Sequence, residues 1–195
     1  EVDCYKPGDG QYPDEKTRNA LAINPIKYWQ VGNLIGPGNA FAGVVKLAYP
    51  EIKRADPAAK VLLGGDGGDY EAVLGALGGQ YLDILDRHYF GTARGHYRSL
   101  LRISELREML TNAGFPSDMP IWITETGTYT GHPEGQIQAQ TEREQAIDLL
   151  KRYVYMGSQG VQKLFWAYGL KEPFGSPEDN DFWDGTGLIY DGYTT

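Results

Sequence analysis

The chain has little of what several classes of binding site require. It contains a single cysteine, Cys4, and three histidines that lie far apart in the sequence. One cysteine excludes an internal disulfide and a cysteine-cluster metal site. The histidines lack the close spacing of a transition-metal site. The sequence therefore predicts neither a metal nor a cofactor.

Basic charge and long apolar runs are also missing. The net charge is −8 with no block of like charge, and no apolar run approaches the length of about 20 residues that a membrane span needs. These features argue against nucleic acid and membranes as partners, because phosphate binding requires a basic patch. The 195 residues, 41% of them apolar, are enough for one globular domain. Fourteen tyrosines and four tryptophans are compatible with a neutral ligand such as a sugar.

Short apolar stretches alternate with helical segments along the chain. Residues 1–25 are polar, contain Pro-Gly and Asp-Gly turns, and are expected to be irregular. This alternation predicts βαβ units and a parallel sheet, and near-continuous apolar strands agree because such sheets are covered on both faces. The expected strands are 26–33, 61–65, 82–90, 121–125 and 163–167, with helices over 40–55, 71–77 and 99–113 and from residue 141 to about 157.

Two of the expected helices carry specific signals. Asn39 is expected to cap the first of them, and Pro50 to kink or split it. Thr141 and Glu144 form a capping box at the start of the last one. That helix carries three apolar residues on one face: Ile147, Leu150 and Val154.

One strand ends in a carboxylate. Ile121–Ile123 alternates β-branched and aromatic residues and leads to Glu125, and Gly127 opens the following loop. In parallel α/β barrels, catalytic groups lie at this end of the strands. The alternative is a structural glutamate that caps a helix or pairs with an arginine.

Five short stretches, taken in their order and spacing, resemble strands four to eight, and the entry to the last helix, of the large clan of retaining glycoside hydrolases built on (β/α)8 barrels. Each stretch alone is a weak match, and together they cover residues 26 to 191. They are Tyr28-Trp-Gln-Val-Gly-Asn33 with its Gly/Pro loop, Arg87-His-Tyr89, Ile121-Trp-Ile-Thr-Glu-Thr-Gly127, Phe165-Trp166 and Gly185-Thr-Gly-Leu-Ile189.

This resemblance implies a role for several side chains. Glu125 takes the position of the catalytic nucleophile, and Trp166 that of the aromatic floor beneath the sugar. His88, Tyr89 and Asn33 take positions where the family hydrogen-bonds the nucleophile and the sugar hydroxyls.

The sequence departs from the family at the acid/base position. The family has a glutamate directly after the strand-four asparagine, whereas this chain has Leu34 there. Leucine cannot transfer a proton, so the role is vacant. Four other carboxyls are candidates to replace it, each with an ordinary structural or solvated role as the alternative: Asp66, Asp69, Asp86 and Glu134.

The chain is also short for a closed barrel, which typically needs about 250 residues. Residues 1–195 are expected to form a single partial barrel of about five parallel strands, similar to the C-terminal part of the family fold. Whether this is a natural short protein or a piece of a longer gene stays open. The strands near residues 28 and 165 would each lack a neighbour, and exposed edges favour pairing with other chains. We therefore expect a homo-oligomer.

Two functions follow from these expectations. The first is a glycoside-hydrolase-like protein that binds carbohydrate and is weakly active or inactive because position 34 holds leucine. The second is a non-catalytic carbohydrate-binding or purely structural half-barrel that assembles into oligomers.

Overall fold

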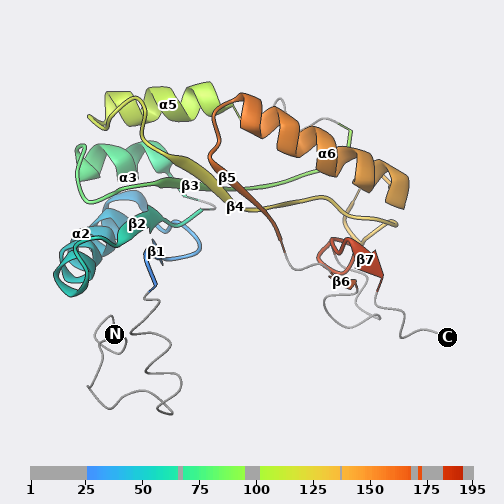
Figure 1. Ribbon diagram of the computed structural model, residues 1–195, viewed down its shortest axis with the longest axis horizontal. Coiled ribbons are helices and arrows are strands. Elements are labelled where there is room, and N and C mark those ends of the chain that lie inside the picture. Colours follow the sequence, from blue (N-terminus) through green and yellow to red (C-terminus); the bar gives the residue numbers. More distant parts are fainter. Residues whose placement is uncertain are drawn as a thin grey trace, which may run out of the picture. The chain divides into compact units, whose positions relative to one another are not determined.

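The computed structural model describes residues 26–65, 68–94, 102–136, 138–167, 171–172 and 182–190. These residues form an α/β fold of parallel strands alternating with helices (Figure 1). The predicted irregular segment 1–25 lies outside them. The elements, in chain order, are β1 (Tyr28–Val31), α2 (Gly38–Ala55), β2 (Lys60–Leu63), α3 (Tyr70–Leu77), β3 (Leu85–Phe90), α5 (Ile103–Asn112), β4 (Ile121–Gly127), α6 (Glu142–Ser158), β5 (Lys163–Trp166), β6 (Lys171–Glu172) and β7 (Ile189–Tyr190).

The fold divides into two compact units. The first comprises the described residues of Glu1–Leu85 and Met109–Met119, and the second those of Asp86–Glu108 and Pro120–Thr195. The first unit holds β1 and β2, which pair in parallel from Tyr28 opposite Lys60 to Val31 opposite Leu63. The second holds a sheet in the order β3-β4-β5 and the short parallel pair β6-β7. The expectation of about five parallel strands is thus confirmed for the main sheets.

Close packing of α2 against α3 organises the first unit. A Cβ added to Gly38, the first residue of α2, would come within 2.7 Å of the Ala72 side chain on α3. The helix begins at Gly38, two residues earlier than expected, so Asn39 lies inside it and does not cap it. Pro37 precedes the helix without a side-chain cap, and its carbonyl accepts a hydrogen bond from the Phe41 amide.

The expectation that Pro50 splits α2 is wrong, since the helix continues through it to Ala55. Pro50 is exposed. At an exposed position, the carbonyl that loses its amide partner to the proline can be satisfied by water instead. Burial of Ala42, Val45 and Ile52 holds the helix against its unit on both sides of the proline.

Helix α6 begins as the sequence predicted, with a complete capping box between Thr141 and Glu144. Its apolar face, however, is exposed: Leu150 keeps 69% and Val154 73% of their accessible surface. The buried face is polar for most of its length, with Gln145, Asp148, Arg152 and Met156 turned inward. An apolar stripe normally marks the core side of a helix, and here it marks the outer side.

Within the described part of the chain, no helix combines the length and the apolar character needed to cross a membrane.

Candidate functional site

Strand β4 carries Glu125 to the C-terminal end of the second unit's central strand. Ile121 and Ile123 are completely buried and anchor the strand in the core. The Glu125 side chain keeps 22% of its accessible surface, so a partly exposed carboxylate follows the buried residues that fix the strand. The sequence predicted that the strand stops at Glu125 and that Gly127 opens the following loop, but β4 continues to Gly127, so Glu125 lies two residues before the end of the strand.

His88, on the neighbouring strand β3, contacts this carboxylate. Its Nδ1 lies 3.3 Å from Glu125 Oε2, and its side chain is only 2% exposed. Burial prevents the imidazole from turning toward solvent, and the contact fixes the orientation of the carboxylate. The structure thus brings together two of the predicted site residues.

Asp86 and Thr124 lie behind His88. The Thr124 hydroxyl is 2.6 Å from Asp86 Oδ2 and 3.1 Å from His88 Nε2, and the Thr124 amide donates to Asp86 Oδ1 at 3.0 Å. Asp86 is fully buried. Burial raises the pKa of Asp86 above its usual value, although the bonds from Thr124 and the neighbouring imidazole favour the ionised form. A side chain without contact to solvent cannot protonate a leaving group, so Asp86 serves in a buried network and not as the missing acid.

Thr124 is a site residue that the sequence analysis missed. Consecutive residues of a regular strand point to opposite faces, so Thr124 and Glu125 would not be expected to share a partner. Both nevertheless contact His88. The pairing of β4 with β5 is irregular between Ile123 and Thr126, and such bulges re-aim side chains and recur beside active sites. No signal in the sequence marks this irregularity.

Trp166 lies at the end of β5, beside the end of β4. It pairs in register with Thr126, and its indole lies 3.7 Å from the position that a Cβ on Gly127 would take. The indole Nε1 donates to the Thr186 carbonyl at 2.7 Å, which fixes the ring. The half-buried indole therefore has a defined orientation, and Trp166 lies opposite Thr126, the residue that follows Glu125 on β4.

Further aromatic rings lie nearby in the second unit. Phe90 at the end of β3 contacts Trp183 edge to face, with ring centroids 4.9 Å apart, and a Cβ on Gly127 would meet Phe90 at 3.8 Å. Phe182 packs against both rings and against Tyr129. The sequence analysis did not identify this aromatic cluster, because its members come from three separate segments.

Tyr89 is buried and turns toward α6. The Arg152 guanidinium lies 5.2 Å from the centre of its ring, and the Tyr89 carbonyl accepts a hydrogen bond from the Thr126 hydroxyl at 2.7 Å. Since Tyr89 follows His88 on a strand, its side chain leaves from the opposite face. Its contact with the sugar or the nucleophile stays a prediction.

Asn33 and Leu34 belong to the first unit, directly after β1. Both are exposed, and Leu34 keeps 63% of its accessible surface. The Asn33 side chain accepts a hydrogen bond from Gln30 at 3.3 Å.

The remaining carboxyl candidates have ordinary surroundings where the structure describes them. Asp69 is the N-cap of α3 and accepts from the Ala72 amide at 2.9 Å. Glu134 is exposed in a turn. Asp66 lies outside the described residues. Within the described part of the chain, no cluster of three or more histidine, cysteine or carboxylate side chains could hold a metal ion.

No family model and no curated protein matches this chain. Solved structures do match its fold. A glucosidase from Croceicoccus marinus superimposes with a TM-score of 0.67 at 21% identity, over 97% of this chain and 40% of its own. An α-L-arabinofuranosidase from Thermotoga maritima gives 0.67 at 17% identity, over 97% and 41%. A family 17 β-1,3-glucanosyltransferase from Rhizomucor miehei gives 0.61 at 14% identity, over 90% and 65%.

The chain has a partial glycoside-hydrolase fold. It spans between 40% and 65% of the length of these three structures. The similarity therefore supports the expected architecture, a part of a (β/α)8 barrel, and it concerns the fold alone.

Proposed function

We propose that this chain is a glycoside-hydrolase-like partial barrel that binds carbohydrate and hydrolyses natural glycosides weakly or not at all. The observation that supports it most directly is the partly exposed Glu125 carboxylate, held 3.3 Å from the buried imidazole of His88 at the end of β4. The comparisons with glycosidases support the carbohydrate ligand.

In this proposal Glu125 is the nucleophile that attacks the anomeric carbon. The fixed indole of Trp166 offers an apolar face against which a sugar ring can stack. Retaining hydrolysis also needs a second carboxyl about 5–5.5 Å from the first, which protonates the leaving group and later activates water. Leu34 occupies the position that the resemblance assigns to this group, so departure of a poor leaving group would go unassisted.

Glycosides with activated aryl leaving groups test the proposal, because they need little acid assistance. We expect slow release of the aryl group by the natural protein and none above background by Glu125→Gln. Glu142→Gln is the matched control, since it removes an exposed carboxylate from the first turn of α6, outside the candidate site. Equal activity of the natural protein and Glu125→Gln would contradict the assignment. Thermal unfolding would show that both variants remain folded.

The alternative is a non-catalytic carbohydrate-binding or structural half-barrel. The exposed leucine at position 34 favours this alternative, because a site without an acid/base group has no catalytic role that would preserve the arrangement of its other residues. Calorimetry distinguishes the two functions: binding of oligosaccharides without turnover of any aryl glycoside supports the alternative. Absence of binding to any glycan would leave a structural role.

Self-association is the second part of the proposal. In the described residues, β5 is at the edge of its sheet and β1 at the edge of the other, and Phe165 on β5 keeps 46% of its accessible surface. The edge strand of a sheet can pair through its backbone with a strand of another chain. A second copy of this chain would supply both a strand edge and an apolar surface.

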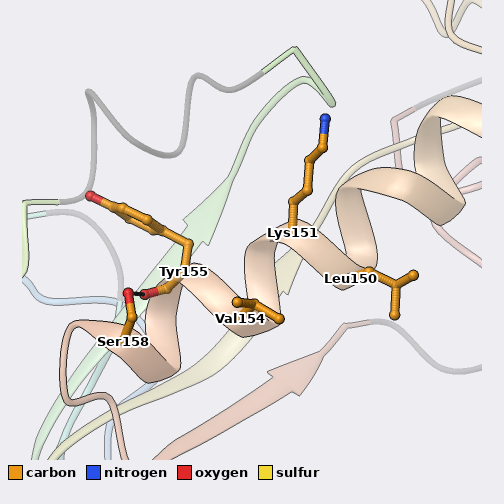
Figure 2. A pocket seen from close by; sticks show the side chains of 5 residues that line it. All are labelled: Leu150, Lys151, Val154, Tyr155 and Ser158. Atoms are coloured by element: carbon orange, nitrogen blue, oxygen red, sulfur yellow. Dashed lines mark hydrogen bonds between the residues drawn. The ribbon is translucent and has the colours of Figure 1, made fainter.

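The outer face of α6 provides the apolar part of this surface. Figure 2 shows Leu150 and Val154 one turn apart on the helix, with Tyr155 next to Val154 in the chain. Together with Lys151 and Ser158 they line a hollow of about 390 Å³. Ile147 continues the stripe and is 41% exposed. Burying one leucine side chain contributes about 1.5–3 kcal/mol to the free energy of association. A second copy that covers this stripe would therefore be stabilised by several such contributions.

We expect light scattering to give a mass that is a multiple of the 21.6 kDa of one chain. Leu150→Lys should lower the mass to that of one chain, because it places a charge in the stripe. Asn112→Lys adds the same charge at an exposed position on α5 and should leave the assembly intact. A natural protein that stays at 21.6 kDa over a wide range of concentrations would exclude self-association.

A further inference from the structure

Three side chains form a hydrogen-bonded line through the second unit, and the carboxylate of Glu125 lies in contact with its end. It begins at the fully buried Asp86 on β3, passes through the Thr124 hydroxyl to His88 Nε2, and leaves from His88 Nδ1 toward Glu125. Asp86 Oδ2 and His88 Nε2 are 3.8 Å apart, too far for a direct hydrogen bond, so the hydroxyl is the link between them. The line therefore joins a carboxyl without solvent contact to one that keeps 22% of its accessible surface.

The Thr124 hydroxyl has one hydrogen and two neighbours. It can donate to Asp86 or to His88, and it must then accept from the other. If it donates to an ionised Asp86, His88 Nε2 carries a hydrogen. If Asp86 is protonated and donates to Thr124, the hydroxyl donates to a bare Nε2. The state of Asp86 and the tautomer of His88 are thus coupled through one hydroxyl.

The contact at the other ring nitrogen limits the choice. An ionised carboxylate repels the lone pair of a bare ring nitrogen, so the 3.3 Å contact between Nδ1 and Glu125 Oε2 favours a hydrogen on Nδ1. With Asp86 ionised, this makes His88 an imidazolium and buries an ion pair. With Asp86 protonated, His88 is neutral with its hydrogen on Nδ1, and no charge is fully buried.

Desolvation favours the second arrangement. Burial raises the pKa of Asp86, and its side chain has no accessible surface. An ion pair in such a place costs desolvation energy on both sides. Glu125 is the more exposed carboxyl of the two, so it is the one that solvent helps to keep ionised.

We propose that Asp86 and Thr124 are positioning residues that act through His88: protonated Asp86 donates to Thr124, Thr124 donates to His88 Nε2, and the neutral imidazole donates its Nδ1 hydrogen to Glu125. The line holds the Glu125 carboxylate in one orientation, which a nucleophile requires. This inference rests on the proposed function only in calling Glu125 a nucleophile.

The hydrogen positions can be measured by nuclear magnetic resonance on protein with ¹⁵N-labelled histidine. Long-range proton–nitrogen correlations distinguish a ring nitrogen that carries hydrogen from one that does not. His96→Gln and His132→Gln variants assign the His88 signals. At pH 7 we expect His88 to have a protonated Nδ1 and a bare Nε2. A bare Nδ1, or hydrogens on both nitrogens, would overturn the proposal.

The role of the hydroxyl is isolated by removing the charge of Glu125. In Glu125→Gln the amide can donate or accept, so it does not select a tautomer, and the Asp86–Thr124 line alone should hold the hydrogen on Nδ1. Adding Thr124→Val should lower the ratio of the Nδ1–H to the Nε2–H tautomer about tenfold, which corresponds to the loss of one net hydrogen bond. Thr124→Ser keeps a hydroxyl and should preserve the ratio. An unchanged ratio with valine would overturn the relay.

The variant Asp86→Asn tests whether Asp86 is protonated. The amide of Asp86→Asn can donate to Thr124 as a protonated carboxyl does, so the His88 signals should stay as in the natural protein. A change of the His88 signals, from hydrogens on both ring nitrogens in the natural protein to a hydrogen on Nδ1 alone in Asp86→Asn, would mean that Asp86 is an ionised acceptor, and would contradict the proposal. None of these spectra requires turnover, so they remain decisive even if no glycoside is hydrolysed.

Discussion

Leu34→Glu is expected to raise the hydrolysis of glycosides with poor leaving groups by about 10²–10⁴-fold, the usual contribution of a general acid/base. The substitution restores the residue type that the family resemblance places directly after Asn33. Because Leu34 keeps 63% of its accessible surface, the glutamate can be accommodated without burying a charge. Initial rates on alkyl and aryl glycosides of the same sugar would measure the gain, which should be larger for the alkyl leaving group.

Two variants serve as controls for this experiment. Leu34→Gln has the same length as the glutamate but cannot transfer a proton, and it should leave the rate unchanged. Leu47→Glu places a carboxylate at another exposed leucine, on α2, and should also have no effect. If Leu34→Glu gives no increase, position 34 does not serve as the acid/base position of this chain.

Asp148→Ala is expected to lower the free energy of unfolding by about 3–5 kcal/mol, the cost of leaving a buried charge without its partner. Asp148 and Arg152 on α6 are both completely buried, with Asp148 Oδ2 2.9 Å from Nε and 2.8 Å from Nη2 of the arginine. Arg152 Nη1 also donates to the Thr126 hydroxyl at 3.0 Å, directly beyond Glu125 on β4. Loss of Asp148 should therefore loosen the link between α6 and the strand that carries the site.

Urea unfolding, followed by circular dichroism, would measure this change. Glu51→Ala is the matched control, because it removes the partner of Arg54 from an ion pair whose side chains are more than half exposed. Exposed pairs contribute about 0–1 kcal/mol, so the control should be nearly as stable as the natural protein. Equal destabilisation by the two variants would show that the Asp148–Arg152 pair does not hold α6 in place.

Local signals in the sequence were sufficient for the order of the elements. Alternating apolar strands and helical segments predicted βαβ units, and the capping box located the start of α6 at Glu142. The strand that carries Glu125 was predicted from its β-branched residues, although it ends at Gly127 and not at Glu125. Each of these features depends on neighbours in the chain, so no tertiary information was needed.

The sequence did not show which face of α6 is covered. An apolar stripe usually marks the inner side of a helix, yet the inner side of α6 holds the charged pair Asp148 and Arg152. Periodicity measures only which residues share a face, and it does not show what packs against that face. In this chain Asp148 and Arg152 form an ion pair with each other, which allows a polar face to point inward.

The sequence by itself determined the parallel α/β architecture, the position of Glu125 at a strand end, and the leucine where the family has its acid/base. Only the tertiary structure decided what surrounds Glu125: the irregular pairing of β4 brings Thr124 and Glu125 to the same imidazole, and β3 adds Asp86 behind it. The reason is physical. Secondary structure follows from short-range periodicity, whereas a hydrogen-bonded line across two strands depends on their register, which residues distant in sequence set together.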